Sequence, residues 1–236
     1  MGTPATEIAH WDTWNSKYRQ PETLDEPSRR RMHEILASLR GLKVQGAKVL
    51  EVGCGTGWLS SKLREFGEVT AVDLGVEIIE AAKVLYPEID FRSGDIHTLD
   101  LAVGSFDVIV TLETFSHVPD QSAFLRRLSE LLKPSGLLLL TTQNRFVFER
   151  RSDVRPNIGY LRKWVTMSEL KRLLRSEFSL RRATSLEPEG HLGLLRVVNS
   201  VRLNGLLSRV LKAAWLKRAK EQFRFGQTLY VVAVKR

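Results

Sequence analysis

The hydrophobic positions in the middle of the chain follow two patterns that alternate. Short continuous apolar runs are separated by longer stretches in which apolar residues recur every three or four positions. The first pattern is typical of buried strands and the second of amphipathic helices. The alternation predicts a doubly wound α/β fold, with a parallel sheet covered by helices on both faces. We expect strands at 47–52, 69–72, 89–91, 106–111 and 137–142, and helices at 27–40, 57–66, 76–86 and 121–132.

The C-terminal third departs from this alternation. We expect a helix at 168–176 with Ser168 as its N-cap, a strand at 178–186 and a strong final strand at 228–234. An apolar helical stripe with basic flanks lies between the last two strands, which predicts a helical insertion at 190–224 on the substrate side. The length of 236 residues fits one domain, with an N-terminal helical lid at 1–40 and a ligand-binding core at 41–145.

The charge of the chain is unevenly distributed. The net charge is +9, and residues 196–224 hold eight lysines and arginines against the single acid Glu221. Such a surface either attracts an anionic partner or is an ordinary solvated basic face. The N-terminus does not resemble a signal peptide, no apolar run is long enough to span a membrane, and Cys54 is the only cysteine. We therefore expect a cytoplasmic protein.

Glycines mark the junction between the first expected strand and the helix that follows it. Gly53, Gly55 and Gly57 allow a sharp turn and a close approach of the backbone to a ligand. The free N–H groups at the start of the following helix favour an anionic group on that ligand. The spacing differs from that of the dinucleotide motif, because Trp58 follows Gly57 directly. Asp73 lies twenty residues after Gly53, at the end of the second strand, where we expect it to accept hydrogen bonds from two ribose hydroxyls.

These residues belong to a set of motifs that resembles a known family. The segment 49–57 (Val-Leu-Glu-Val-Gly-Cys-Gly-Thr-Gly), then Asp73, the triplet 94–96 (Gly-Asp-Ile) and the run 106–120 follow one another in the order and spacing of class I S-adenosylmethionine-dependent methyltransferases. The similarity covers about residues 40–145. The resemblance implies a Rossmann-like, seven-stranded sheet whose last strand is antiparallel.

The resemblance also implies a binding site for S-adenosylmethionine. This cofactor carries an ammonium, a carboxylate and a sulfonium, so its site needs acids as well as the N–H groups of a helix end. The family pattern places the three glycines along the methionine portion, Glu51 near its amino end and the Leu112 backbone near the same amine. It further implies that Asp73 binds the ribose, that Leu74 and Ile96 contact the adenine, and that Asp95 accepts from the adenine amine.

His117 is the candidate general base. Histidine titrates near pH 6.5, and this one follows the fourth strand, at the edge of the sheet where crevice ligands bind. The alternative is a histidine packed at the start of the next helix, donating to a backbone carbonyl. Glu113, four residues earlier, is a candidate partner of His117 and a candidate substrate-contacting residue.

Other acceptor-side candidates carry weaker signals. Asn144 and Arg145 follow the fifth strand and resemble a pattern in sugar- and quinol-modifying relatives, although a surface salt bridge also explains Arg145. Trp11 and Tyr18 share a helical face that either closes over the cofactor or packs in the core, and His191 is a further candidate. No paired metal-ligand spacing is evident, so we expect no metal site, although whether a metal assists stays open.

The leading hypothesis is methyl transfer to a hydroxyl of a small molecule, such as a quinol, a saccharide or a lipid-linked sugar, with His117 as the base. The alternatives are an amine N-methyltransferase, an RNA methyltransferase and a cofactor-binding protein without catalysis. The net charge favours RNA, but the chain lacks an appended RNA-binding module, so nucleic acid is not the expected partner. The basic amphipathic stretch 202–218 predicts contact with an anionic membrane surface.

Overall fold

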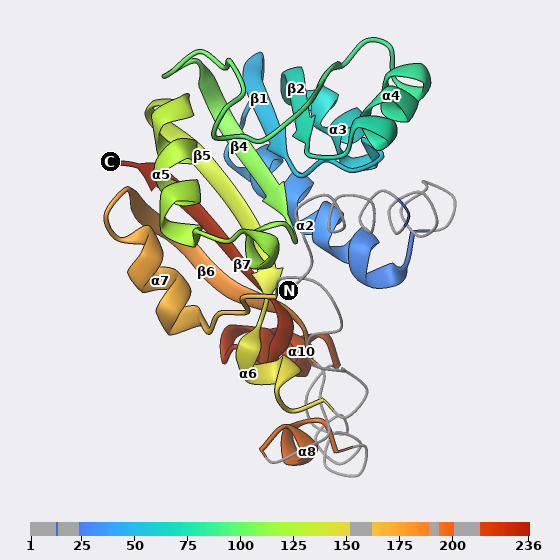
Figure 1. The fold of residues 1–236 in the computed structure, drawn as a ribbon. Coiled ribbons are helices and arrows are strands. Elements are labelled where there is room, and N and C mark those ends of the chain that lie inside the picture. The colour runs from blue at the N-terminus through green and yellow to red at the C-terminus, as the bar shows by residue number, and fades with distance from the viewer. Residues whose placement is uncertain (1–12, 14–23, 152–161, 189–193, 201–212) are drawn as a thin grey trace.

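The chain forms one seven-stranded sheet with helices on both faces (Figure 1). The structure, a computed structural model, describes residues 13, 24–151, 162–188, 194–200 and 213–236. The strand order is β3-β2-β1-β4-β5-β7-β6, and β7 runs antiparallel to both of its neighbours. The doubly wound sheet with an antiparallel last strand is therefore confirmed. The strands are β1 (Ala47–Val52), β2 (Gly67–Asp73), β3 (Asp90–Ser93), β4 (Phe106–Leu112), β5 (Leu132–Gln143), β6 (Phe178–Pro188) and β7 (Gly226–Lys235).

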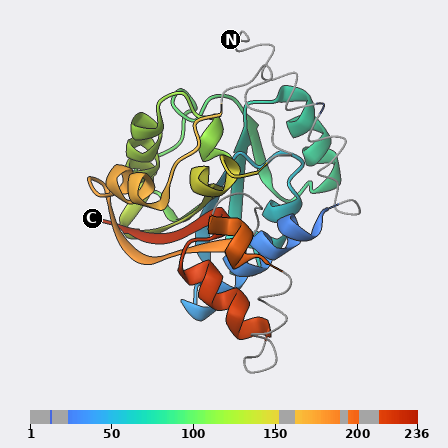
Figure 2. The same ribbon diagram turned by 90° about the horizontal axis from the view of Figure 1, so that it is seen from below.

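Two sets of helices bury the two faces of the sheet. One face is covered by α2 (Glu26–Gly41), α3 (Trp58–Leu63) and α4 (Val76–Leu85), and the other by α5 (Gln121–Leu131) and α7 (Met167–Leu174). Figure 2 shows α5 in green and α7 in orange on one side, with α2 in blue and α4 in teal on the other. Because both faces are covered, the inner strands are apolar at successive positions.

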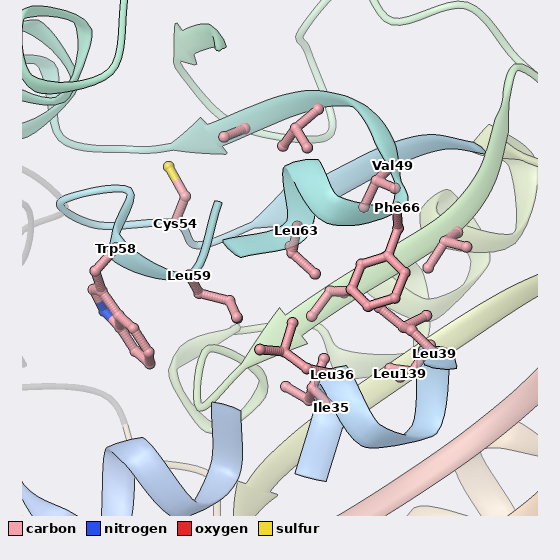
Figure 3. Close-up of a cluster of buried hydrophobic side chains, with 14 of the residues drawn as sticks. Ile35, Leu36, Leu39, Val49, Cys54, Trp58, Leu59, Leu63, Phe66 and Leu139 are labelled. Carbon is pink, nitrogen blue, oxygen red and sulfur yellow. The ribbon is translucent and has the colours of Figure 1, made fainter. Parts of the chain in front are cut away.

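The core beneath α2 explains the apolar stripe of that helix. Ile35 and Leu39 are fully buried and lie with Leu59 and Leu63 of α3 in one cluster (Figure 3). Asp25 caps the helix by accepting a hydrogen bond from the Ser28 N–H at 2.8 Å. The described part of the expected N-terminal lid is therefore a helix of the core. The remainder of residues 1–23, except Thr13, lies outside the described residues.

Short helices gather beyond the carboxyl end of β5. There α6 (Arg145–Phe148), α8 (Leu194–Val198) and α10 (Ala213–Gln222) lie at the lower end of the molecule in the view of Figure 1. Both α8 and α10 fall within the expected helical insertion at 190–224, between β6 and β7, whereas residues 201–212 lie outside the described residues. Within the part of the chain that the structure describes, no helix is both long and apolar enough to cross a membrane.

Two element boundaries differ from the sequence prediction. The N-cap of α7 is Thr166 rather than Ser168, because Thr166 and Glu169 form a reciprocal capping box in which each side chain bonds the other's backbone N–H. Strand β5 begins at Leu132, five residues before the expected start at Leu137. Its pairing with β4 is irregular at this point, since Phe106 pairs with Leu132 and Val108 with Leu137.

Strand register brings the ends of the parallel strands to one edge of the sheet. Leu112 at the end of β4 pairs with Thr141, and Asp73 at the end of β2 pairs with Ser93. The start of the antiparallel β7 reaches the same edge, where Thr228 pairs with Gln143. In open α/β sheets this carboxyl edge is where ligands bind.

Candidate active site

The glycine-rich loop between β1 and α3 adopts a conformation that requires glycine. Gly53, Gly55 and Gly57 have φ values of 78°, 52° and 77°, in the left-handed region. A Cβ atom on Gly53 would lie 2.0 Å from Thr114 Oγ1, so close packing also demands glycine at that position. The Gly53 N–H donates to the Val72 carbonyl at 2.8 Å, which holds the loop against the end of β2.

Asp73 joins this loop to the turn after β2. Its Oδ2 accepts from the Gly55 N–H at 2.8 Å and its Oδ1 from the Gly75 N–H at 3.1 Å. Burial raises the pKa of the Asp73 carboxyl, while these backbone hydrogen bonds lower it. An ionised carboxylate offers about four acceptor positions, so each oxygen retains capacity for one further hydrogen bond. That capacity matches the two hydroxyls of a ribose.

The residues expected around an adenine lie beside Asp73. Leu74 is 51% exposed, which leaves apolar surface next to a carboxylate, while Ile96 is 7% exposed. The Asp95 side chain accepts from the His97 N–H at 2.9 Å in a tight turn. Arg127 of α5 donates to the Ile96 carbonyl at 3.0 Å and fixes this turn from below. The predicted adenosine-binding residues are thus brought together, although their individual roles stay predictions.

Glu51 lies beneath the glycine-rich loop. It is only 2% exposed, and its Oε2 accepts a hydrogen bond from Ser60 Oγ of α3 at 2.5 Å. Burial raises the pKa of Glu51 to about 8; the neighbouring Asp73 adds to this rise, and the Ser60 hydrogen bond opposes it. Glu51 therefore links the end of β1 to α3 under the loop. Leu112, at the end of β4, lies at the same edge, and its carbonyl accepts from Thr114 Oγ1 at 3.4 Å.

The candidate base lies in the one-turn helix η3 (Phe115–His117) that follows β4. His117 is partly buried, and its N–H donates to the Thr114 carbonyl at 2.9 Å. Ser116 anchors the turn from below, since its Oγ donates to Gln143 Oε1 at 2.5 Å and its carbonyl accepts from the Lys163 N–H at 2.7 Å. His117 is therefore held in a hydrogen-bonded turn at the carboxyl edge, and its role as the base stays a prediction.

The two candidates after β5 make contacts within the protein. Asn144 is 1% exposed, and its Nδ2 donates to the carbonyls of Arg224 at 3.0 Å and Gly226 at 2.8 Å. Arg145 pairs with Glu169 at 2.7 Å. These contacts describe a structural asparagine and an ion pair, so they lend no support to the prediction of substrate contact. Three further candidates lie outside the described residues: Trp11, Tyr18 and His191.

A buried ion pair at this edge was missed by the sequence reasoning. Arg31 of α2 is 6% exposed and lies 3.3 Å from Glu187 Oε2 at the end of β6. It also reaches Thr228 Oγ1 on β7 at 3.4 Å, which ties α2 to both strands. The signal was present, because Arg31 precedes Ile35 by four positions and so shares the buried face of the helix. Thr114, which packs on Gly53, had no comparable signal.

No metal centre is visible in the portion of the chain that the structure describes. No group of three or more histidine, cysteine, aspartate or glutamate side chains there is arranged to hold an ion. Cys54 is buried, and burial raises the pKa of its thiol well above the ordinary value. The thiol therefore stays protonated and is a poor nucleophile.

The fold and the site define a class of protein. A doubly wound sheet carries a glycine-rich turn, a carboxylate suited to a ribose and an exposed apolar residue beside it, all at one edge, as in α/β proteins that bind an adenosine-containing cofactor. Residues 50–140 match the model of the methyltransferase domain family.

Known proteins agree with this match. The chain is 42% identical over 112 residues to a ubiquinone biosynthesis O-methyltransferase of Xanthomonas euvesicatoria pv. vesicatoria, which covers 44% of the chain and 46% of that protein. The chain thus matches just under half the length of this relative. Its fold resembles an S-adenosylmethionine-dependent methyltransferase from Mesorhizobium loti, with a TM-score of 0.59, 19% identity and coverage of 85% and 96% of the two chains.

A second solved structure covers the chain more fully. It is a complex of the Haloferax volcanii Trm112 methyltransferase activator with its partner, with a TM-score of 0.68, 18% identity and coverage of 95% and 96%. Residues 50–140 therefore match a methyltransferase domain, and the motifs and the sheet order resemble those of class I S-adenosylmethionine-dependent methyltransferases.

Proposed function

We propose that the chain transfers a methyl group from S-adenosylmethionine to a hydroxyl of a small molecule, with a phenol or quinol as the acceptor class. One observation carries the proposal: the glycine-rich loop with Asp73 and the turn that holds His117 meet at one edge of the sheet, joined by the contact of Thr114 with Gly53. The similarity to an O-methyltransferase of ubiquinone biosynthesis supports a phenolic acceptor over a saccharide.

The residues present fit the cofactor. Asp73 retains acceptor capacity for ribose hydroxyls, and Leu74 offers exposed apolar surface for an adenine. The left-handed glycines let the backbone approach the methionine portion without a Cβ in the way. When bound, S-adenosylmethionine supplies a methyl group on a positively charged sulfur, which keeps the bonding electron pair as the acceptor oxygen forms its new bond.

His117 takes the proton that the acceptor hydroxyl must lose. A neutral hydroxyl is a poor nucleophile, and a phenol with a pKa near 10 is largely protonated at neutral pH. A histidine with an ordinary pKa near 6.5 accepts a proton at that pH, and general base catalysis of this kind contributes about 10²- to 10⁴-fold. An amine acceptor is nucleophilic when neutral, so its methylation would depend far less on His117.

The test is methyl transfer from labelled S-adenosylmethionine to a panel of phenols, quinols, sugars, amines and bulk RNA. We expect a phenol or quinol to turn over, and His117→Ala to lose about 10²-fold or more in kcat/KM. His33→Ala, which removes an exposed histidine of α2, is the matched control and should keep full activity. Labelling of amines or RNA alone, or an unaffected His117→Ala, would overturn the proposal, and cofactor binding without any turnover would favour a non-catalytic protein.

We also propose that the α10 region touches an anionic membrane surface. Trp215 and Phe223 are 68% and 72% exposed, and the neighbouring Arg218 and Arg224 are exposed cations. Exposed aromatics beside basic residues are typical of helices that lie in the membrane interface. Of the stretch 202–218, only residues 213–218 are among those described.

Sedimentation with liposomes tests this contact. The wild type should sediment with vesicles containing phosphatidylglycerol at low salt, and the double variant Trp215→Ala, Phe223→Ala should lose most of this binding. Vesicles of phosphatidylcholine alone are the control for charge. Equal binding of variant and wild type, or no binding at low salt, would refute the membrane contact.

A further inference from the structure

Glu113 adopts a backbone conformation that disfavours any residue with a side chain. Its φ is 62°, in the left-handed region, directly after β4. The neighbouring strand enforces this conformation, because the Glu113 N–H donates to Thr141 Oγ1 at 3.0 Å and to the Thr141 carbonyl at 3.2 Å. Glycine adopts the same conformation freely. A glutamate held here against its preference points to a function of its side chain, since strained residues cluster at functional sites.

The Glu113 carboxylate has an unfilled hydrogen-bonding position. Its Oε1 is buried and accepts no hydrogen bond from any residue that the structure describes. Buried polar atoms nearly always have a partner, because leaving one unpaired is unfavourable. An ionised carboxylate only accepts, so the missing partner must be a donor.

The chain on either side of Glu113 places it between the two halves of the site. The next residue, Thr114, packs on Gly53 of the cofactor loop, and its carbonyl accepts from the N–H of His117. Thr141, which holds the Glu113 backbone, lies near the end of β5. A molecule bound between the glycine-rich loop and the candidate base would lie next to Glu113 and could supply this donor.

We propose that Glu113 is an acceptor-binding residue whose Oε1 accepts a hydrogen bond from a donor group adjacent to the hydroxyl that is methylated. This inference rests on the proposed function and adds a specificity: the acceptor carries a second hydroxyl or an N–H beside the reacting one. An acceptor without that donor leaves a buried carboxylate oxygen unpaired, and it is rejected for this reason. His117 takes the proton of the reacting hydroxyl. Glu113 orients the acceptor by accepting a hydrogen bond from the second hydroxyl or N–H beside the reacting one.

The test uses Glu113→Gly, which removes the carboxylate and relieves the backbone together. We expect its thermal midpoint to rise by about 2–4 °C, because relief of the left-handed backbone outweighs the freedom that glycine adds to the unfolded chain. Affinity of the S-adenosylhomocysteine complex for 4-methylcatechol should fall roughly 10- to 150-fold, the value of one hydrogen bond to a charged group. Affinity for 4-methylphenol, which lacks the second hydroxyl, and affinity for S-adenosylhomocysteine itself should change little.

Lys43→Gly is the matched control. Lys43 is an exposed residue with φ of 56° after α2, so glycine relieves its backbone in the same way without touching the site. It should gain stability and keep catechol binding. A Glu113→Gly protein that is less stable than the wild type, or that still prefers the catechol as the wild type does, overturns the role of Glu113 while the proposed function stands. A wild type that methylates no hydroxyl acceptor overturns both.

Discussion

Asp73→Ala weakens binding of S-adenosylmethionine by about 2–4 kcal/mol, or roughly 30- to 700-fold in Kd. This is the expected result because the Asp73 carboxylate has two functions at once. It holds the glycine-rich loop through the Gly55 and Gly75 N–H groups, and each oxygen retains capacity for a ribose hydroxyl. Each hydrogen bond to a charged group contributes about 1.5–3 kcal/mol. Titration calorimetry with S-adenosylmethionine measures the loss directly.

A double-mutant cycle separates these two functions of Asp73. The wild type should bind S-adenosylhomocysteine more tightly than its 2′-deoxy analogue, whereas Asp73→Ala should bind both with similar affinity. If the variant still discriminates between the two ligands as the wild type does, then Asp73 supports only the loop and its ribose role is wrong. Asp90→Ala, which removes an exposed carboxylate from β3, is the control and should bind both ligands as the wild type does.

The sequence predicts best those parts of the fold that depend on residues close together along the chain. Strands β1, β2 and β4 are each an apolar run followed by a helix, so each unit is short and its signals are local. The glycines of the loop are equally local, because their φ values follow from the tight turn itself. Consequently the sheet, the cofactor loop and the position of Asp73 were all predictable.

The features that sequence missed depend on residues that are far apart along the chain. The contact of Thr114 with Gly53 joins the ends of β4 and β1, and the pairing of Arg31 with Glu187 joins α2 to β6. The left-handed conformation of Glu113 is enforced by Thr141 on the neighbouring strand, and no glycine marks it. Local periodicity carries no information about such partners.

Long-range contacts also explain why Asn144, expected to contact the substrate, makes hydrogen bonds within the protein. Its position after β5 matched a pattern of acceptor-side residues, but the side chain is used to close the junction with β7 through the carbonyls of Arg224 and Gly226. Those partners lie more than 75 residues away, so their proximity to Asn144 depends on the antiparallel pairing of β5 with β7. Assigning roles on the acceptor side therefore requires the tertiary structure.

Glu51→Gln should make the folded protein more resistant to high pH. Because Glu51 is buried, its pKa in the folded state is about 8, against an ordinary value of 4.5. Between these two values the folded protein holds a proton that the unfolded chain releases, so unfolding releases a proton and rising pH favours it. The wild type therefore loses stability from about pH 4.5 to about pH 8, by an amount on the order of a few kcal/mol.

The difference in unfolding free energy between Glu51→Gln and wild type isolates this titration. Glutamine has no proton to lose and retains an oxygen that accepts from Ser60 Oγ. The two proteins should differ by less than about 1 kcal/mol at pH 5, where the hydrogen bond is kept in both, and the variant should be the more stable at pH 9. Urea unfolding at pH 5, 7 and 9 measures this, with Glu68→Gln, an exposed glutamate on β2, as the control that leaves the wild-type curve unchanged. If the unfolding free energies of Glu51→Gln and wild type instead change in parallel with pH, then Glu51 is already ionised in the folded protein at pH 5. Hydrogen bonds and the helix end would then offset the effect of burial on its pKa.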